Sequence, residues 1–377
     1  MPRSVSESAA VLTIDLGAIA ENWRRLQLKL NNVPCAAVVK ADAYGLGADN
    51  VAPALWQAGC RTFCVALTEE AVDLRKVLPT ANIHVLGGIW TGDIDALVEY
   101  SLTPVLNSLD DVHRWRSVCI QKQKALPCDV QFDTGMARLG LDRIEVSRLQ
   151  STPDLLSGLN IDVVLSHLAC ADDPDHPLNA EQRSRFDAYR KLCNAKRASF
   201  ANSSGIFLGA DYHFDLGRPG IALYGGNPTP QTNNPMAQTI KLQGKILQVR
   251  HVDHSETVGY GASYHVTGPT RVATVGVGYA DGYLRSLSSS GFGTIGGHRI
   301  PVVGRISMDL ITFDVTSVPE TVTVPGALID LIGTDEDADA VSDKAGTISY
   351  EILTSLGDRY ARTYVNAEIP RPQGTHS

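Results

Sequence analysis

Eight short apolar runs recur between residues 35 and 224 of this 377-residue chain, and their spacing limits the folds that it can adopt. Most are separated by stretches that can form helices, such as 68–78 and 178–197. The pattern predicts a (β/α)8 barrel, with an open doubly wound sheet as the alternative. No GxGxxG follows the first run, which weighs weakly against the open sheet. The runs lie at 35–39, 62–67, 83–87, 103–106, 128–132, 162–167, 198–201 and 220–224.

The composition changes at 227–235, where Pro, Thr, Asn and Gln predominate and a surface linker is predicted. Beyond it, polar and apolar residues alternate, as in antiparallel strands. We therefore expect a β/α barrel at 1–235 and a mostly antiparallel β domain at 236–377. A strand at 11–14, followed by a helix that Asp15 caps, could pack with the second domain. The alternating runs lie at 242–250, 270–277, 299–303 and 309–315, and a helix is expected at 348–356.

The charge balance excludes several classes of partner. With 33 Lys and Arg against 41 Asp and Glu, the formal net charge is −8, whereas nucleic-acid binding rests on an excess of basic side chains.

No apolar stretch reaches the roughly 18 residues of a membrane span, and no secretory signal is recognisable. Seven cysteines without CxxC pairs fit reduced thiols better than disulfides or a metal site. We expect a cytoplasmic protein that binds no metal, nucleic acid or membrane.

Lys40 stands directly after the apolar run 35–39 and before a glycine-containing turn. In parallel α/β folds the carboxyl ends of the strands face the active site. A lysine beside an apolar strand can form a Schiff base with a carbonyl compound. A single lysine in this position is more often only solvated, so the interpretation depends on the motifs around it.

Eight motifs together resemble alanine racemase, a barrel-type (fold type III) enzyme that uses pyridoxal 5'-phosphate, and the resemblance covers nearly the whole chain. One motif alone could arise by chance, but their order and spacing make the match specific. The motifs are AVVKADAYGLGA at 37–48, DTGMARLG at 133–140, SHLACAD at 166–172, ANSSG at 201–205, LGRPGIALYG at 216–225, VGYGASY at 258–264, VGVGYADGYLR at 275–285 and GRISMD at 304–309.

The resemblance implies that Lys40 binds pyridoxal 5'-phosphate as a Schiff base and moves one proton. Racemisation requires a second acid-base group on the other face of the substrate, and Tyr260 is the residue implied. Because a phenol titrates near pKa ~10, Tyr260 can act as a base at neutral pH only with positive charge or hydrogen-bond donors nearby. In the family, a chain of hydrogen bonds links this tyrosine to the residue at His167 and then to the arginine at Arg218. Arg218 would also face the ring nitrogen and keep it unprotonated, which disfavours transamination.

The phosphate group would be bound by the hydroxyls of Tyr44 and Ser203 and by the backbone amides of Gly220 and Ile221. Asn202, in the same motif as Ser203, would help to orient the ring. The family places a further phosphate-binding tyrosine near the C-terminus. An ungapped comparison puts Asp358 at that position, and Tyr360 could replace the missing tyrosine.

The substrate carboxylate would be bound by Arg138, whose planar guanidinium forms paired hydrogen bonds, and by the backbone at Met308. Many family members brace this arginine with a carbamylated lysine, but the chain has Gln131 there. Glutamine cannot be carbamylated. We predict that Gln131 braces Arg138 as a neutral acceptor or beside an anion such as chloride.

The remaining family positions imply a passage into the site and a shared assembly. Residues that match those lining the passage are Asp172, Tyr279, Arg285 and Arg305. In the family, Tyr260 and Met308 enter the site from the neighbouring subunit, so a homodimer with shared active sites is expected.

The predicted activity is interconversion of L- and D-alanine, which supplies D-alanine for peptidoglycan or serves alanine catabolism. A pocket for a small side chain discriminates one methylene by only ~1–3 kcal/mol, so a broader racemase that accepts serine is one alternative. A barrel decarboxylase that uses the same cofactor and a non-catalytic carrier of pyridoxal 5'-phosphate are the others. Arg218 at the ring nitrogen and Tyr260 opposite Lys40 favour the racemase.

Overall fold

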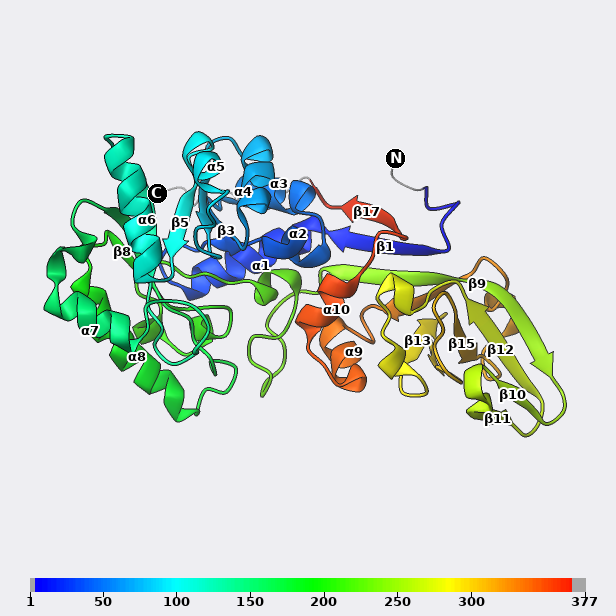
Figure 1. The fold of residues 1–377 in the computed structure, drawn as a ribbon. Coiled ribbons are helices and arrows are strands. Elements are labelled where there is room, and N and C mark those ends of the chain that lie inside the picture. The colour runs from blue at the N-terminus through cyan, green and yellow to red at the C-terminus, as the bar shows by residue number, and fades with distance from the viewer. Residues whose placement is uncertain (1–3, 368–377) are drawn as a thin grey trace, which may run out of the picture.

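A computed structural model describes residues 4–367 of the chain. Figure 1 shows a barrel of strands and helices beside a second, mostly antiparallel sheet, with β1, β9 and β17 in the region between them. The predicted fold class, a parallel barrel followed by an antiparallel β domain, is confirmed. Among the described residues, no helix has both the length and the hydropathy that crossing a bilayer requires.

The barrel wall is a parallel sheet in which each strand pairs with the next along the chain. Its strands are β2 (Ala37–Val38), β3 (Thr62–Val65), β4 (Asn82–Val85), β5 (Thr103–Leu106), β6 (Pro127–Gln131), β7 (Asn160–Leu165) and β8 (Arg197–Ser199). The helices of this part are α1 (Leu16–Lys29), α2 (Lys40–Gly45), α3 (Ala48–Ala58), α4 (Thr68–Val77), α5 (Ile94–Glu99), α6 (Leu109–Gln121), α7 (Arg143–Ser151) and α8 (Pro177–Tyr189).

The eighth apolar run, 220–224, does not form a strand. It contains the short 3-10 helix η5 (Ile221–Tyr224), which is buried on the barrel. The residues before it fill the space between β8 and β2: the amide of Ala36 donates to the carbonyl of Gly217 at 2.9 Å, and the amide of Val38 donates to that of Pro219 at 3.0 Å. Apolar content alone cannot distinguish a buried strand from a buried helical turn, and this prediction was wrong for that reason.

The second sheet contains β1 (Ala10–Asp15), β9 (Ile240–Val252), β12 (Thr270–Val275), β13 (Phe292–Ile295), β14 (His298–Pro301), β15 (Ile311–Asp314), β16 (Leu328–Ile332) and β17 (Ala361–Val365). A separate hairpin is formed by β10 (Glu256–Val258) and β11 (Tyr264–Val266), and the helices are α9 (Ala338–Ala345) and α10 (Ser349–Ser355). The four strands that alternation predicted in this region are present as β9, β12, β14 and β15, and the helix expected at 348–356 is α10.

The N-terminal strand β1 belongs to the second sheet by its hydrogen bonds. It pairs antiparallel with β9 and parallel with β17, and its Leu12 and Ile14 are fully buried. Directly after it, the Asp15 side chain accepts a hydrogen bond from the amide of Ala18 at 2.9 Å and caps α1. The chain therefore enters the barrel from the second sheet and returns to that sheet after the linker.

Candidate active site

The carboxyl end of β2 leads into a backbone turn of the opposite hand to an ordinary helix. After Lys40, the residues Ala41, Asp42, Ala43 and Tyr44 all have φ between 51° and 58°. For residues with a Cβ this conformation costs roughly 1–2 kcal/mol each, so the surrounding structure must hold it. Strain of this kind is concentrated at functional sites.

Three cationic side chains and a histidine come together around this turn. Burial, followed by the positive charge of Arg138, lowers the pKa of the Lys40 amine, and the carboxylate of Glu70 opposes this. Burial and the charges of Arg218, Arg138 and Lys40 lower the pKa of His167 to about 3, so the imidazole is neutral at physiological pH. The carboxyl ends of β2, β6 and β7 thus create a positive site that favours an anionic ligand.

Arg218 is buried inside the barrel and held by two hydrogen bonds. Its Nη1 donates to the hydroxyl of Ser199, and its Nη2 donates to the backbone carbonyl of Ser166 at 2.6 Å. Burial lowers the pKa of Arg218, but guanidinium remains protonated in proteins. The resemblance implies a hydrogen bond to His167; in the structure these two residues are coupled through charge.

Tyr44, Ser203 and Gly220 form a compact group of hydrogen-bonding atoms. The hydroxyl oxygen of Ser203 accepts from the amides of Gly220, at 3.0 Å, and Ala222, at 3.2 Å. A Cβ at Gly220 would overlap the hydroxyl of Tyr44, so only glycine fits there. The amide of Ile221, in the first turn of η5, has no acceptor within its helix. Hydroxyls and amides of this kind can bind a phosphate group.

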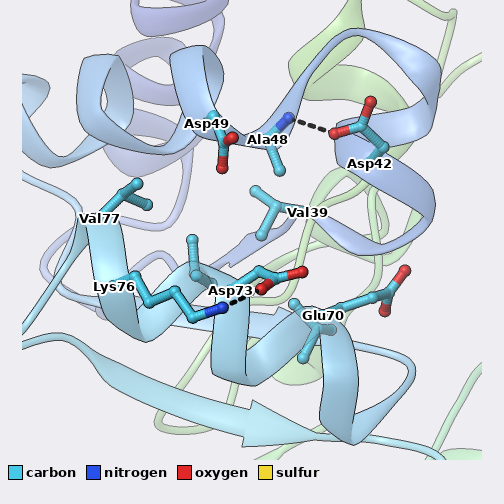
Figure 2. A pocket seen from close by; sticks show the side chains of 10 residues that line it. Val39, Asp42, Ala48, Asp49, Glu70, Asp73, Lys76 and Val77 are labelled. Carbon is cyan, nitrogen blue, oxygen red and sulfur yellow. Dashed lines mark hydrogen bonds and ion pairs between the residues drawn. The ribbon is translucent and has the colours of Figure 1, made fainter.

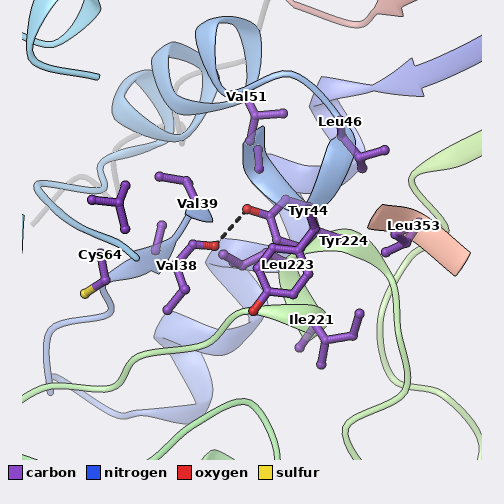
Figure 3. Close-up of a cluster of buried hydrophobic side chains, with 14 of the residues drawn as sticks. Val38, Val39, Tyr44, Leu46, Val51, Cys64, Ile221, Leu223, Tyr224 and Leu353 are labelled. Carbon is purple, nitrogen blue, oxygen red and sulfur yellow. Dashed lines mark hydrogen bonds between the residues drawn. The ribbon is translucent and has the colours of Figure 1, made fainter. Parts of the chain in front are cut away.

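The ring of Tyr44 contacts the rings of two other tyrosines. Its ring stacks on that of Tyr224, with centroids 4.6 Å apart, and contacts that of Tyr350 at 5.9 Å. The hydroxyl of Tyr224 donates to the carbonyl of Val38, 2.8 Å away, as Figure 3 shows. Burial raises the pKa of Tyr44 well above its usual value, so its hydroxyl stays protonated and can donate to an anion.

The structure places the other two residues predicted for the cofactor as follows. Asn202 bridges two loop segments, because its Oδ1 accepts from the amide of Gly205 at 2.9 Å and its Nδ2 donates to the carbonyl of Leu168 at 3.3 Å. The hydroxyl of Tyr360 is buried and donates to the backbone carbonyl of Asp281 in the second domain. It is therefore Tyr350, and not Tyr360, whose ring contacts Tyr44.

Arg138 projects from the loop after β6, and its side chain is exposed. The carboxylate of Asp133 accepts hydrogen bonds from the amides of three following residues and thereby fixes the shape of this loop. Gln131 donates through Nε2 to the carbonyl of Leu139, at 3.1 Å, so its amide braces the backbone next to Arg138. That Gln131 also braces the guanidinium, directly or through an anion, stays a prediction.

The site residues predicted in the second domain share one exposed region. Tyr260 is 73% exposed and Met308 is 54% exposed. A Cβ at Gly261 would contact the guanidinium of Arg305, and the amide of Tyr279 donates to the carbonyl of the residue before Met308. Loops 258–262, 278–281 and 304–308 are thus packed together.

This region lies far from Lys40 within one chain. Tyr260 lies in the short segment between β10 and β11. Figure 1 shows these two strands at the end of the molecule opposite the barrel. Arg285 is exposed at the start of a 3-10 helix in the same domain. Asp172 is exposed on the barrel side, and its charge adds to burial, the larger cause, in raising the pKa of Tyr350.

Several residues that support the site were not found by sequence reasoning. Three of them stand inside the motifs quoted above or in the C-terminal helix, namely Ser166, Tyr224 and Tyr350, but nothing in those motifs shows which atoms they contact. Ser199 and Glu70 belong to no such motif, and only the fold brings them to Arg218 and to the turn after Lys40.

Comparison with known proteins gives a consistent result. The family model described as "Alanine racemase, N-terminal domain" matches residues 14–228, and "Alanine racemase, C-terminal domain" matches residues 239–364. A curated alanine racemase of Rhodospirillum rubrum is 53% identical over 95% of this chain and 96% of its own. A catabolic alanine racemase of Mesorhizobium japonicum is 46% identical over 97% of this chain and 95% of its own.

A solved structure agrees with these sequence matches. The crystal structure of alanine racemase from Bartonella henselae, with covalently bound pyridoxal phosphate, superimposes with a TM-score of 0.91 at 42% identity. The match covers 95% of this chain and 100% of that one. Both family models, the curated relatives and the fold agree, and the chain belongs to the alanine racemase family.

Proposed function

We propose that this chain interconverts L- and D-alanine with pyridoxal 5'-phosphate held covalently at Nζ of Lys40. The observation that carries the proposal is the gathering of Lys40, Arg138, His167 and Arg218 at the carboxyl end of the barrel. The lowered pKa of Lys40 fits an amine that must be deprotonated to react. When bound, the cofactor would withdraw electrons from the amino acid and weaken its Cα–H bond.

The residues present fit the cofactor's two polar ends. The hydroxyls of Tyr44 and Ser203, with the amides of Gly220 and Ile221, would bind the phosphate group. Because Gly220 has no Cβ, the hydroxyl of Tyr44 can lie directly against its backbone, and both could contact the same phosphate group. Arg218, buried and charged, would hold the ring nitrogen without giving up a proton, while Asn202 supports the loop beside it.

Proton transfer would use Lys40 on one face of the substrate and Tyr260 on the other. Tyr260 is exposed and distant from Lys40 within one chain, so we propose that it comes from the second subunit of a homodimer. His167, which its lowered pKa keeps neutral, has one ring N–H that would donate a hydrogen bond to the phenolate oxygen of this tyrosine. The cationic surroundings would favour the phenolate that acts as base.

Arg138 would bind the substrate carboxylate from the barrel, and the backbone at Met308 would contact it from the partner subunit. Asp172, Tyr279, Arg285 and Arg305 would line the passage by which alanine reaches the site. The reaction would take place in the cytoplasm, where D-alanine serves peptidoglycan synthesis or alanine is degraded. One of the relatives is named a catabolic enzyme, which favours neither role by itself.

The deciding experiment incubates the purified protein and cofactor with L-alanine in heavy water. We expect loss of the α-proton signal together with formation of D-alanine. Exchange without D-alanine, or neither event, would contradict the proposal.

The alternative functions are tested with other substrates. Racemisation of serine would indicate a broader racemase. Release of carbon dioxide from lysine, ornithine or diaminopimelate would indicate a decarboxylase. Lys40→Ala should abolish covalent binding of the cofactor, whereas Tyr260→Phe should keep it and lose most of the activity toward L-alanine.

A further inference from the structure

Glu70, in the first turn of α4, connects the ends of two barrel strands. Its Oε1 accepts a hydrogen bond from the amide of Ala41 at 2.6 Å, directly after Lys40. Its Oε2 accepts from the amides of Ala66, at 2.8 Å, and Leu67, at 3.0 Å, directly after β3. One half-buried carboxylate therefore serves three backbone donors, and bonds from amides to an ionised acceptor are stronger than neutral ones.

The bond to Ala41 is the one that concerns Lys40. The amide of Ala41 belongs to the same planar peptide group as the carbonyl of Lys40. Fixing that plane restricts the backbone of Lys40 and therefore the direction in which its side chain leaves. Ala41 is also the first of the four left-handed residues, whose conformation is unfavourable unless external bonds hold it.

Two other hydrogen bonds also hold this turn. The Oδ1 of Asp42 accepts from the amide of Ala48 at 2.7 Å, and the amide of Ala43 donates to the carbonyl of Val39 at 2.9 Å. Figure 2 shows Val39, Asp42 and Glu70 among the residues that line a pocket between α2, α3 and α4. The volume of this pocket is about 420 Å³. Within the described residues, Glu70 is the side chain that ties the start of the turn to the neighbouring strand.

We infer that Glu70 is a positioning residue for the racemisation: it fixes the peptide after Lys40 and thereby holds the lysine amine where the cofactor and the substrate proton require it. This inference rests on the proposed function. The negative charge of Glu70 also offsets part of the influence of Arg138 on the pKa of Lys40. A purely structural role, in which Glu70 only caps α4 through Leu67, predicts a different experimental result.

The test compares Glu70→Gln with Glu69→Gln in the holoenzyme. Glu69 precedes Glu70 in the same helical turn and is exposed, so its substitution removes the same charge from the same helix end. Glutamine at 70 retains one acceptor, but its NH2 group faces backbone donors and cannot accept from them. Hydrogen-deuterium exchange of the peptide that covers 40–46 reports on the turn directly, independently of turnover.

We expect Glu70→Gln to accelerate exchange in 40–46 about tenfold or more, as the loss of one such hydrogen bond permits. We expect kcat to fall about ten- to a hundredfold through misplacement of the amine, with KM for alanine nearly unchanged. Glu69→Gln should alter neither quantity. If Glu70→Gln lowers only the unfolding midpoint, while exchange in 40–46 and kcat match Glu69→Gln, Glu70 only caps α4 and the inference is wrong.

Two further results separate this inference from the proposed function. If the unmodified protein binds the cofactor but racemises no alanine, the proposed function fails, and the exchange comparison still decides whether Glu70 holds the turn. If Glu70→Gln does not fold, Glu70→Asp replaces it, because aspartate keeps the charge but is one methylene too short to reach both strands. Unaltered exchange and kcat in Glu70→Asp would then overturn the inference.

Discussion

The ring of Tyr44 stacks on that of Tyr224, with centroids 4.6 Å apart, and this contact joins the proposed phosphate site to the strand that carries Lys40. The connection continues because the Tyr224 hydroxyl donates to the carbonyl of Val38, two residues before Lys40 (Figure 3). A single aromatic residue, Tyr224, thus supports both the group that would bind phosphate and the backbone next to Lys40, whose amine is proposed to react.

Tyr224→Phe should lower the free energy of unfolding by about 1–3 kcal/mol, because it leaves the buried carbonyl of Val38 without its donor while the ring stack remains. Urea denaturation of the cofactor-free protein measures this. Tyr350→Phe is the matched control: its ring also contacts that of Tyr44, but Tyr350 is 42% exposed, so a change within about 0.5 kcal/mol is expected. Equal losses in both variants would contradict the role of the Val38 bond.

Gly220→Ala should weaken cofactor binding about ten- to a hundredfold, because the added Cβ overlaps the Tyr44 hydroxyl and overpacking of this kind costs about 1–3 kcal/mol. Titration of the dialysed protein with pyridoxal 5'-phosphate, followed by visible absorbance, measures the affinity. Gly268→Ala adds the same group where nothing lies within 4 Å and should bind normally. If Gly220→Ala binds pyridoxal 5'-phosphate with normal affinity, the phosphate group does not bind beside Gly220 and Tyr44.

The pH dependence of stability should carry a contribution from His167. Its pKa in the folded protein, about 3, lies below the ordinary value of 6.5, so between these values the unfolded chain binds a proton that the folded chain does not. The contribution of His167 to the free energy of unfolding is therefore fully present above pH 6.5. It is lost as the pH is lowered, by at most about 1.4 kcal/mol per pH unit.

Urea denaturation of the cofactor-free protein at pH 7.5 and pH 5.5 tests this contribution. His167→Asn should lose less stability between the two values than the unmodified protein. His265→Asn, which replaces an exposed histidine on β11, should behave as the unmodified protein does. The assignment to His167 is contradicted if all three proteins lose the same amount.

The proposed sharing of active sites between two subunits predicts complementation. Lys40→Ala and Tyr260→Phe each damage a different half of the site, so each homodimer should be nearly inactive. After both variants are mixed, unfolded and refolded together, half of the dimers should be mixed, and each of these has one intact site. Recovery of about a quarter of the normal activity is expected. No recovery, despite mixed dimers seen by native mass spectrometry, would show that Lys40 and Tyr260 act within one chain.

The strands, and the position of Lys40 at the end of one of them, could be predicted from the sequence because those features depend on local pattern. Apolar runs and their spacing predicted β3 to β7 within a few residues, and the position of Lys40 at a strand end is visible in the order of residues alone. The run 220–224 was misread because burial, which strands and helical turns share, produces the same composition in both.

The contacts that complete the site could not be predicted in this way. Ala41 and Ala43 carry no signal for a left-handed backbone, which glycine or asparagine usually supplies. The bonds from Arg218 to Ser199 and from Ala41 to Glu70 join residues far apart in sequence, and only the closed barrel brings them together. Tyr360, chosen for its sequence position, has its hydroxyl bonded to a carbonyl of the second domain.

The pairing of β1 with β9 and β17 has a consequence for synthesis on the ribosome. β1 precedes the barrel in the chain, yet both neighbours that complete its hydrogen bonds are made after the barrel strands. During that interval β1 has no paired strand, and its Leu12 and Ile14, which are fully buried in the folded protein, lack their native contacts with that sheet. The nascent chain therefore exposes an unpaired apolar strand that can aggregate. Chaperone occupancy during translation should therefore be highest at this segment and end once β17 has been made.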